Sequence, residues 1–190
     1  MSSPHPPVPV KFFASMISSQ DELISRASQA LVEQQGKIDL MSERFPFDYT
    51  TYYEEEMGKG LFRRFLFFEE MSSPDRIPSL KGVADLIEER FPGPSGRTVN
   101  IDPGYVTTHH VVLATHKNYA HRIYLRDRVY ADLTLIYQQG SFHPLDWTYP
   151  DYRSPGVISL FHKVRERYMQ QLKKLPQYRE SNPGGSSIPC

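Results

Sequence analysis

Acids, a histidine and arginines that could take part in one reaction gather between residues 100 and 153. Strand alternation would send Asn100 and Asp102 to the same face at the end of a strand, where polar groups can meet a ligand. His121 places an acid/base group of near-neutral pKa beside Arg122, a fork-shaped binder of anions. The functional hypothesis makes Asp102 or His121 the general acid/base. The structural alternatives are a turn at Asp102-Pro103-Gly104 and an exposed strand start at His121.

A second polar run, Trp147–Arg153, precedes a predicted helix. The functional interpretation is a ligand-lining loop at a helix N-terminus, with aromatic walls, Thr148 and Asp151 as polar contacts, and Arg153 for an anionic group. The structural interpretation is that Asp151 or Ser154 caps the helix while Trp147 and Tyr149 fill core. Both interpretations stay open at this point.

The third run, Phe45–Gly58, interleaves aromatic rings with acids. Asp48, Tyr52 and Glu56 would suit a binding lip, and the same pattern suits an edge loop with a solvated acidic turn. Stacking on nucleic-acid bases is favoured where cations stand beside the rings, and here glutamates stand there instead.

Neither a metal nor a phosphate loop is indicated. Histidines 109, 110, 116, 121 and 143 lack a recognisable ligand spacing, and His109 and His110 would point to opposite faces of a strand. The segment Gly93–Thr98 is too short for a phosphate loop, has no lysine, and precedes a strand rather than a helix. We therefore expect no metal and no cofactor.

The elements that would position these residues follow from hydrophobic period and breaker residues. A capping box at Ser19–Glu22 would begin the first helix, Gly36 would end it, and Ser154-Pro155 would begin the last one. Asp102-Pro103-Gly104 would form a turn between two strands. In order, the expected elements are strand Val10–Ile17, helix to Gly36, strands Ile38–Met41 and Leu61–Phe68, helix Pro78–Phe91, strands Thr98–Ile101 and Val111–Thr115, hairpin Arg122–Leu125 with Val129–Tyr137, and the helix after Ser154.

This order predicts an α+β domain. Its first six elements match the ferredoxin-like order βαββαβ, an antiparallel-rich sheet covered by helices on one face. A C-terminal hairpin and helix would extend it. We expect one domain over residues 10–175, with flexible tails at residues 1–9 and 176–190, which are rich in Pro, Ser and Gly.

The amino-acid composition limits the classes of binding partner and the cellular location that we expect. Lysines and arginines (22) balance aspartates and glutamates (22), which argues against a general binder of nucleic acid or anionic membranes. The one cysteine, Cys190, permits no internal disulfide, and no run approaches the apolar length of a signal peptide or a membrane span. The expected location is the cytoplasm, and the oligomeric state stays open.

Five runs in this order resemble a known family: FPFDYTTYYEEEMG, VNIDPGY, LATHKNYAHRIYL, VYADLTLIY and GSFHPLDWTYPDYRSP. Over residues 9–173 the chain resembles domain of unknown function 4416, which is found in bacteria and archaea. The resemblance implies no activity, and the segment Gly93–Thr98 gives no support to the GTP-binding label that some members carry. It implies family positions at Asp48, Tyr52, Tyr53, Glu56, Asn100, Asp102, Gly104, Tyr105, His121, Arg122, Thr148, Asp151 and Arg153.

Together these patterns favour a small-molecule site for an anionic ligand at one mouth of the sheet, with an enzymatic role left open. Arg122 or Arg153 would hold the anionic group, such as a phosphate or a carboxylate. The rival hypothesis is a non-catalytic protein-interaction module that uses exposed aromatic loops. Candidate catalytic residues are Asp102 and His121; candidate ligand-binding residues are Asp48, Tyr52, Glu56, Asn100, Arg122, Thr148, Asp151 and Arg153.

Overall fold

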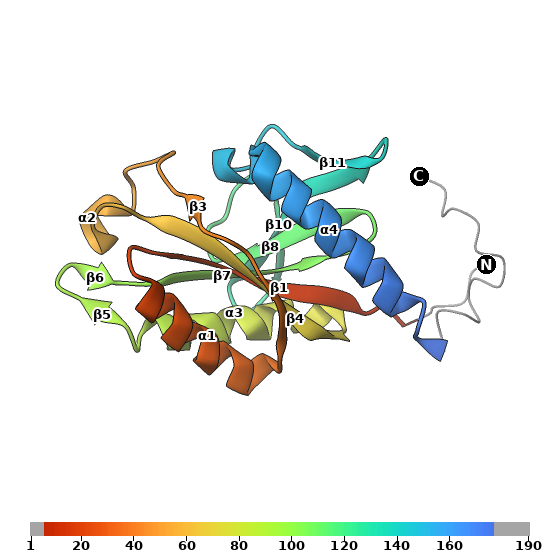
Figure 1. Cartoon of the computed structure of the whole chain (residues 1–190), viewed down its shortest axis with the longest axis horizontal. Helices are drawn as coiled ribbons and strands as arrows, with labels where there is room; N and C mark the ends of the chain where they lie inside the picture. Colours follow the sequence, from red (N-terminus) through yellow and green to blue (C-terminus); the bar gives the residue numbers. More distant parts are fainter. Residues whose placement is uncertain (1–5, 177–190) are drawn as a thin grey trace.

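One antiparallel sheet organises the computed structural model, which describes residues 6–176 (Figure 1). Its main path has the order β11-β10-β8-β7-β1-β4-β2, while β3 pairs with β4 and β9 with β10. The strands are β1 Val10–Ser18, β2 Ile38–Met41, β3 Phe45–Pro46, β4 Phe62–Ser72, β7 Asn100–Val106, β8 His110–Thr115, β9 Arg122–Arg126, β10 Val129–Gln138 and β11 Ser141–Pro144, with β5 Pro92–Gly93 and β6 Gly96–Arg97 as a separate pair.

Helices cover both faces of this sheet, which confirms the α+β class (Figure 1). The α-helices are α1 Asp21–Gln35, α2 Glu54–Met57, α3 Ile77–Glu88 and α4 Pro155–Leu172, and the 3-10 helices are η1 Pro74–Arg76 and η2 Pro150–Arg153. The expectation that helices cover one face holds for α1 and α3 only, because α4 crosses the opposite face.

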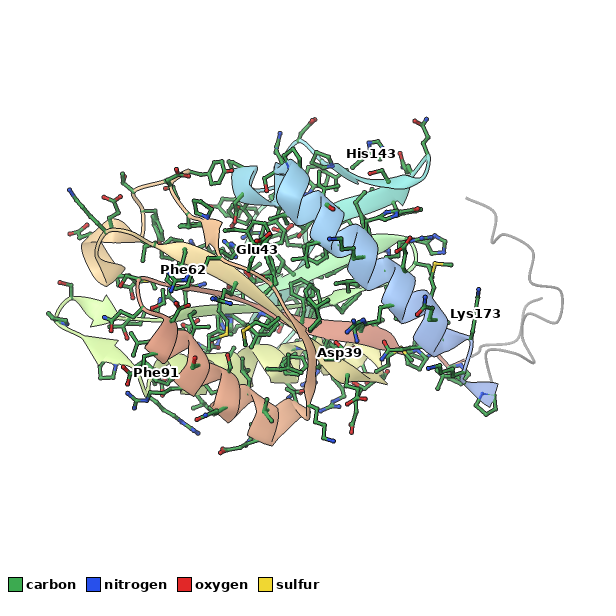
Figure 2. All side chains as sticks on the ribbon, in the orientation of Figure 1. Asp39, Glu43, Phe62, Phe91, His143 and Lys173 are labelled. Carbon is green, nitrogen blue, oxygen red and sulfur yellow. The ribbon has the colours of Figure 1, made fainter. Side chains whose placement is uncertain are left out.

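The two cores explain this arrangement. Every residue of β1 is buried, so the strand needs a partner layer on each side. Phe12 and Met16 pack with α1 and α3, whereas Phe13 lies in the other cluster with Phe161 of α4. Side chains fill the space between the sheet and its helices on both faces (Figure 2).

Several local predictions are confirmed. Gly36 ends α1 with a φ of 87°, a backbone conformation that favours glycine. Ser154 is the N-cap of α4 and its Oγ accepts from the Val157 amide, with Pro155 at the start of the helix. The hairpin of β9 and β10 also forms as expected, with Tyr130 opposite Tyr124.

Two local predictions are wrong. The predicted capping box at Ser19–Glu22 does not form, because the N-cap of α1 is Gln20 and no side chain among the described residues caps the helix. The Gln20 backbone amide donates to Ser18 Oγ just ahead of the helix. The segment Asp102–Gly104 is not a turn, because β7 runs straight through it and Pro103 lies opposite Ala14. β7 pairs with β8 only from Gly104 onward, so at Pro103 the one neighbouring strand among the described residues is β1. A proline, which has no N–H to donate, is tolerated in a strand at such a position.

A buried lysine joins β1 to the last helix. Lys11 is fully buried, and its Nζ lies 2.8 Å from Asp39 Oδ2, 2.8 Å from the Phe68 carbonyl oxygen and 3.1 Å from Gln171 Oε1 (Asp39 is labelled in Figure 2). Burial lowers the pKa of Lys11, and the nearby Asp39 carboxylate opposes this effect.

Among the described residues, no helix has the length and apolarity required to span a membrane.

Candidate functional site

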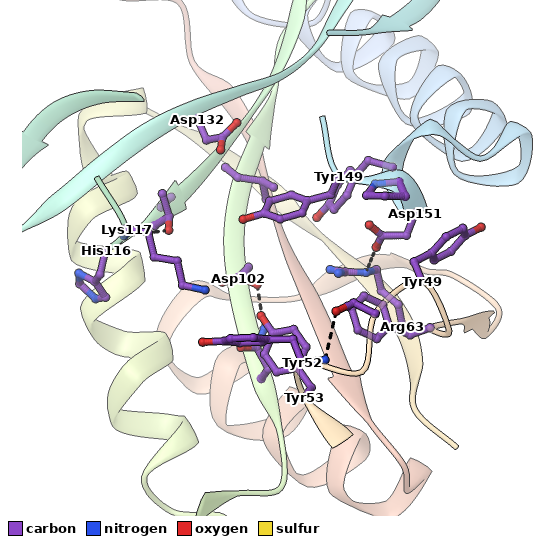
Figure 3. A pocket seen from close by; sticks show the side chains of 18 of the residues that line it. Tyr49, Tyr52, Tyr53, Arg63, Asp102, His116, Lys117, Asp132, Tyr149 and Asp151 are labelled. Carbon is purple, nitrogen blue, oxygen red and sulfur yellow. Dashed lines mark hydrogen bonds and ion pairs between the residues drawn. The ribbon is translucent and has the colours of Figure 1, made fainter. Parts of the chain in front are cut away.

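A cavity of about 560 Å³ opens at one end of the sheet (Figure 3). The first residues of β4 and β7 and the last residues of β8 meet there, and α3, the segment 47–53 and the segment 149–152 complete its walls. Its volume lies within the roughly 300–1,000 Å³ of small-molecule sites. Six of the lining residues are tyrosines, whose rings carry hydroxyl groups: Tyr49, Tyr52, Tyr53, Tyr119, Tyr149 and Tyr152.

One wall is built on a buried ion pair. Arg63 Nε lies 2.6 Å from Asp151 Oδ2, both residues are 5% exposed, and the guanidinium also donates to Ser15 Oγ. The guanidinium lies over the rings of Phe47 and Tyr152. Burial would lower the pKa of Arg63, but the acidic groups around it, with Asp151 the foremost, together outweigh burial and raise the pKa. Arg63 is therefore a fixed cation that Asp151 neutralises.

A second ion pair closes the opposite wall. Arg122 Nε lies 2.7 Å from Asp132 Oδ2, and the same guanidinium donates to the Lys117 carbonyl oxygen at 2.9 Å and to Tyr149 Oη at 2.9 Å. Burial would lower the pKa of Arg122, yet the hydrogen bonds and charges of Asp132 and Tyr149 together outweigh burial and raise the pKa. Because Tyr149 Oη accepts from Arg122, its own proton is free to be donated elsewhere.

The floor contains Asp102. Asn100 Nδ2 donates to Asp102 Oδ2 at 2.8 Å, so the expectation that both face the same way is confirmed. Lys81 Nζ lies 3.7 Å from Asp102 Oδ1 and 3.1 Å from Asp85 Oδ1. Burial lowers the pKa of Lys81, but the three carboxylates of Asp102, Glu88 and Asp85 raise it further, so the lysine is charged at neutral pH. Burial, followed by the charge of Asp102, raises the pKa of Tyr53 and keeps its hydroxyl protonated.

Lys117 enters the cavity from the loop after β8 (Figure 3). Its Nζ lies 4.5 Å from the centroid of the Tyr52 ring. Within residues 6–176, no carboxylate oxygen lies within 4.0 Å of that ammonium, in contrast to Arg63, Lys81, Arg97 and Arg122, which each have at least one.

The cavity brings together five of the residues singled out from the sequence: Tyr52, Asn100, Asp102, Arg122 and Asp151. Arg122 holds two other lining residues in place, since its guanidinium donates to Asp132 Oδ2 and to Tyr149 Oη. The helix cap belongs to Ser154, which leaves the Asp151 carboxylate to Arg63.

His121 stands just outside the lining. Its Nε2 lies 3.4 Å from Asp132 Oδ2, and its ring is stacked between Tyr119 and Trp147 at centroid distances of 6.0 and 5.0 Å. It thus contacts two lining residues, Asp132 and Tyr119, without lining the cavity itself. No contact between His121 and Asp102 is recorded among the described residues.

Thr148 and Arg153 hold the loop that carries Tyr149 and Asp151. Thr148, 3% exposed, donates to the Thr134 carbonyl oxygen at 2.6 Å and accepts from the Leu145 amide. Arg153 donates to the carbonyl oxygens of Thr148, Leu145 and Asp146. These bonds position the wall, and neither residue lines the cavity.

The remaining two predicted residues lie away from the lining. Asp48 is exposed on the segment before α2. Glu56 Oε1 accepts from the Arg97 amide and lies 3.2 Å from Arg97 Nε, so Glu56 holds Arg97, a lining residue, in place without lining the cavity itself. Trp147, 41% exposed, does not fill core; its Nε1 donates to the Leu133 carbonyl oxygen.

Six charged residues that line the cavity were missed from the sequence: Arg63, Lys81, Asp85, Arg97, Lys117 and Asp132. Two of them carried a usable signal, which is a charge at a position that the hydrophobic pattern assigns to the core. Arg63 stands in the Phe/Leu-rich strand β4, and Lys81 stands on the apolar face of α3. Asp132 falls on the polar side of the alternation in β10 and Lys117 lies in a polar loop, so neither stands out from its neighbours.

In the part of the chain that the structure describes, no group of three or more His, Cys, Asp or Glu residues is arranged to hold a metal ion. A family model described as Domain of unknown function (DUF4416) matches residues 8–168. No curated protein and no solved structure matches the chain.

Proposed function

Since the chain belongs to the family described as Domain of unknown function (DUF4416), we propose its function from the cavity itself: it binds a small anionic molecule. The observation that carries the proposal is the Lys117 ammonium, which faces the cavity with no carboxylate partner among the described residues. The other lining cations have carboxylate partners, so Lys117 is the lining cation with which an anionic group of a ligand can pair.

The tyrosines support the same proposal. Six hydroxylated rings offer flat walls for a ligand body, together with donors and acceptors for its polar groups. Arg122 holds Tyr149 Oη as an acceptor, so the Tyr149 proton is available to an anion in the cavity. The ligand would therefore meet one ammonium and at least one phenol.

A screen of anions tests the proposal. Carboxylates, phosphates and nucleotides are added to the protein, and binding to the native state alone raises Tm. For any anion that binds, Lys117→Met is expected to weaken the affinity about 10- to 100-fold, the value of a hydrogen bond to a charged group. Lys163→Met, on the exposed side of α4, is the matched control. Equal affinities of wild type and Lys117→Met would contradict the proposal.

A second candidate function has its own observation. The outer edge of β9 has no strand partner within residues 6–176, and it carries Ile123, 71% exposed, and Tyr124, 57% exposed. Trp147 and Tyr149 are exposed beside the cavity. An interaction module would use such rings as anchors. Size-exclusion chromatography with light scattering of Tyr124→Ser against wild type tests self-association through this edge.

We also propose a specific strand order, domain bounds and a cellular location for this protein. The path β7-β1-β4-β2, with α1 and α3 as the two crossovers, supports a ferredoxin-like order for the first six major elements, which β8 to β11 and α4 extend. We further propose that the protein acts in the cytoplasm of a bacterium or archaeon as one domain over residues 10–175. Of the proposed tails, residues 1–5 and 177–190 lie outside the described residues, and so does Cys190.

A further inference from the structure

We propose that the ligand is a polyhydroxylated anion, of the sugar-phosphate or sugar-acid class, whose hydroxyl groups bind Asp102 while its anionic group binds Lys117. This inference rests on the proposed function. It adds that the ligand carries hydroxyl groups besides its charge, and it assigns Asp102 the role of accepting hydrogen bonds from those hydroxyls.

Asp102 has acceptor capacity to spare. An ionised carboxylate offers about four lone-pair sites. The recorded partners of Asp102 are Asn100 Nδ2, at 2.8 Å from Oδ2, and Lys81 Nζ, at 3.7 Å from Oδ1. The side chain is 30% exposed, and it faces the cavity. A ligand that buries this carboxylate must therefore bring donors, because an unsatisfied buried acceptor costs affinity.

Those donors are hydroxyls rather than an ammonium group. Asp102 is one of three carboxylates that raise the pKa of Lys81, with Glu88 and Asp85, and its charge also raises the pKa of Arg63. A ligand ammonium placed at Asp102 would stand near both of these cations, and Lys117 adds a third positive charge in the same cavity. A hydroxyl donates to Asp102 without that repulsion, and the same oxygen accepts from a neighbouring donor such as the Tyr149 hydroxyl.

The rest of the lining fits an oxygen-rich body. Aliphatic side chains contribute little, since Leu113, Ala114 and Pro150 stand among six tyrosines. A hydrocarbon chain would bury the tyrosine hydroxyls without partners. A sugar ring places its C–H groups on aromatic faces and its hydroxyls within reach of phenols and the carboxylate, and the volume of about 560 Å³ holds a ring with an attached phosphate.

Calorimetric titration with defined probes tests this inference. The polyhydroxylated anions are glucose 6-phosphate, ribose 5-phosphate and gluconate; phenyl phosphate, benzoate and inorganic phosphate supply charge without adjacent hydroxyls; glucose supplies hydroxyls without charge. Wild type is expected to bind at least one polyhydroxylated anion about tenfold or more tighter than every other probe, the effect of one hydrogen bond to a charged acceptor. The phosphate and gluconate arms decide which anionic group is preferred.

Two variants separate the two proposals. Asp102→Asn is expected to abolish the preference for hydroxylated probes while leaving phenyl phosphate binding within about twofold, whereas Lys117→Met weakens every anion. Asp75→Asn, exposed and outside the cavity, is the matched control. Circular dichroism confirms the fold of each variant. Should Asp102→Asn fail to fold, deoxy analogues of the best sugar phosphate report on wild type alone, and each removed hydroxyl that meets Asp102 weakens binding.

The outcomes are distinct. If phenyl phosphate binds as tightly as the sugar phosphates, or if deoxy analogues bind equally well, the hydroxyl inference is overturned while anion binding at Lys117 stands. If anions bind but Lys117→Met has no effect, or if no anion binds, the proposed function falls and the inference falls with it.

Discussion

The Lys117 ammonium lies 4.5 Å from the centroid of the Tyr52 ring, which joins two segments far apart in the sequence at the rim of the cavity (Figure 3). Tyr52 is 63% exposed and belongs to the segment before α2, while Lys117 follows β8. In the free protein the ring is the recorded partner of this ammonium, so an anionic ligand would compete with Tyr52 for it. We therefore expect the contact between Tyr52 and Lys117 at the rim to weaken when an anionic ligand binds.

A double-mutant cycle measures this contact. Tyr52→Leu, Lys117→Met and the double variant are unfolded with urea in the absence of ligand. The expected coupling free energy is about 0.5–1 kcal/mol, typical of an exposed cation–π pair. The same cycle with Tyr124→Leu in place of Tyr52→Leu should give a coupling near zero, because Tyr124 lies on β9 against Tyr130. Equal coupling in both cycles would show that the rim contact contributes nothing specific.

The Arg63–Asp151 pair should be expensive to break from one side. Asp151→Asn leaves a guanidinium charge in a site where the arginine is 5% exposed, and we expect it to lower the free energy of unfolding by about 3–5 kcal/mol. Asp127→Asn removes an exposed partner of Arg126 and should cost at most about 1 kcal/mol. Urea denaturation compares the two, and a similar small loss for both would mean that the buried charge finds other compensation.

Gly104 is a position where a side chain has no room. A Cβ there would lie 2.5 Å from Phe13 Cζ and 2.5 Å from the Val112 carbonyl oxygen, so Gly104→Ala should destabilise the protein by about 1–3 kcal/mol. Gly82, inside α3, meets nothing within 4 Å, and Gly82→Ala should stabilise by about 0.5–1 kcal/mol. Thermal unfolding of the two variants should shift Tm in opposite directions, and a Gly104→Ala protein with unchanged Tm would contradict the close approach.

His110 should make stability depend on pH in the weakly acidic range. Burial, and next the charge of His109, lower the pKa of His110 below its ordinary value of 6.5. The unfolded chain therefore binds the proton more readily, so this contribution to stability is present above about pH 6.5 and is lost as pH falls toward the folded pKa. His110→Gln should lose less Tm than wild type between pH 7.5 and pH 5.5. His143→Gln, exposed on β11, is the control, and parallel loss in all three proteins would refute the assignment.

Thr148 should be needed for the loop rather than for the ligand. Thr148→Val removes the donor to the Thr134 carbonyl oxygen and the acceptor of the Leu145 amide, and we expect a loss of about 1–3 kcal/mol in the free energy of unfolding. Thr50→Val, whose Oγ1 accepts from the exposed Tyr52 amide, should cost less than about 1 kcal/mol. A Thr148→Val protein of wild-type stability with lost anion binding would instead support the direct ligand contact considered from the sequence.

The sequence by itself determined the α+β class and the main helices, because the hydrophobic period, the stop at Gly36 and the start at Ser154-Pro155 are each local signals that act over a few residues. It also determined that Asn100 and Asp102 share a face, since that follows from strand alternation alone. It predicted a turn at Asp102–Gly104 from residue types that favour turns, and there the pairing of β7 with β1 overrides the local preference.

Only the tertiary structure decided which charges remain available. Arg63 and Asp151 neutralise each other across 88 positions of chain (151 − 63), Arg122 is committed to Asp132, and Arg153 is committed to its own loop. No local pattern encodes such pairings, because they depend on which strands become neighbours. For the same reason Lys117, unremarkable in a polar loop, becomes the cation that faces the cavity without a carboxylate among the described residues.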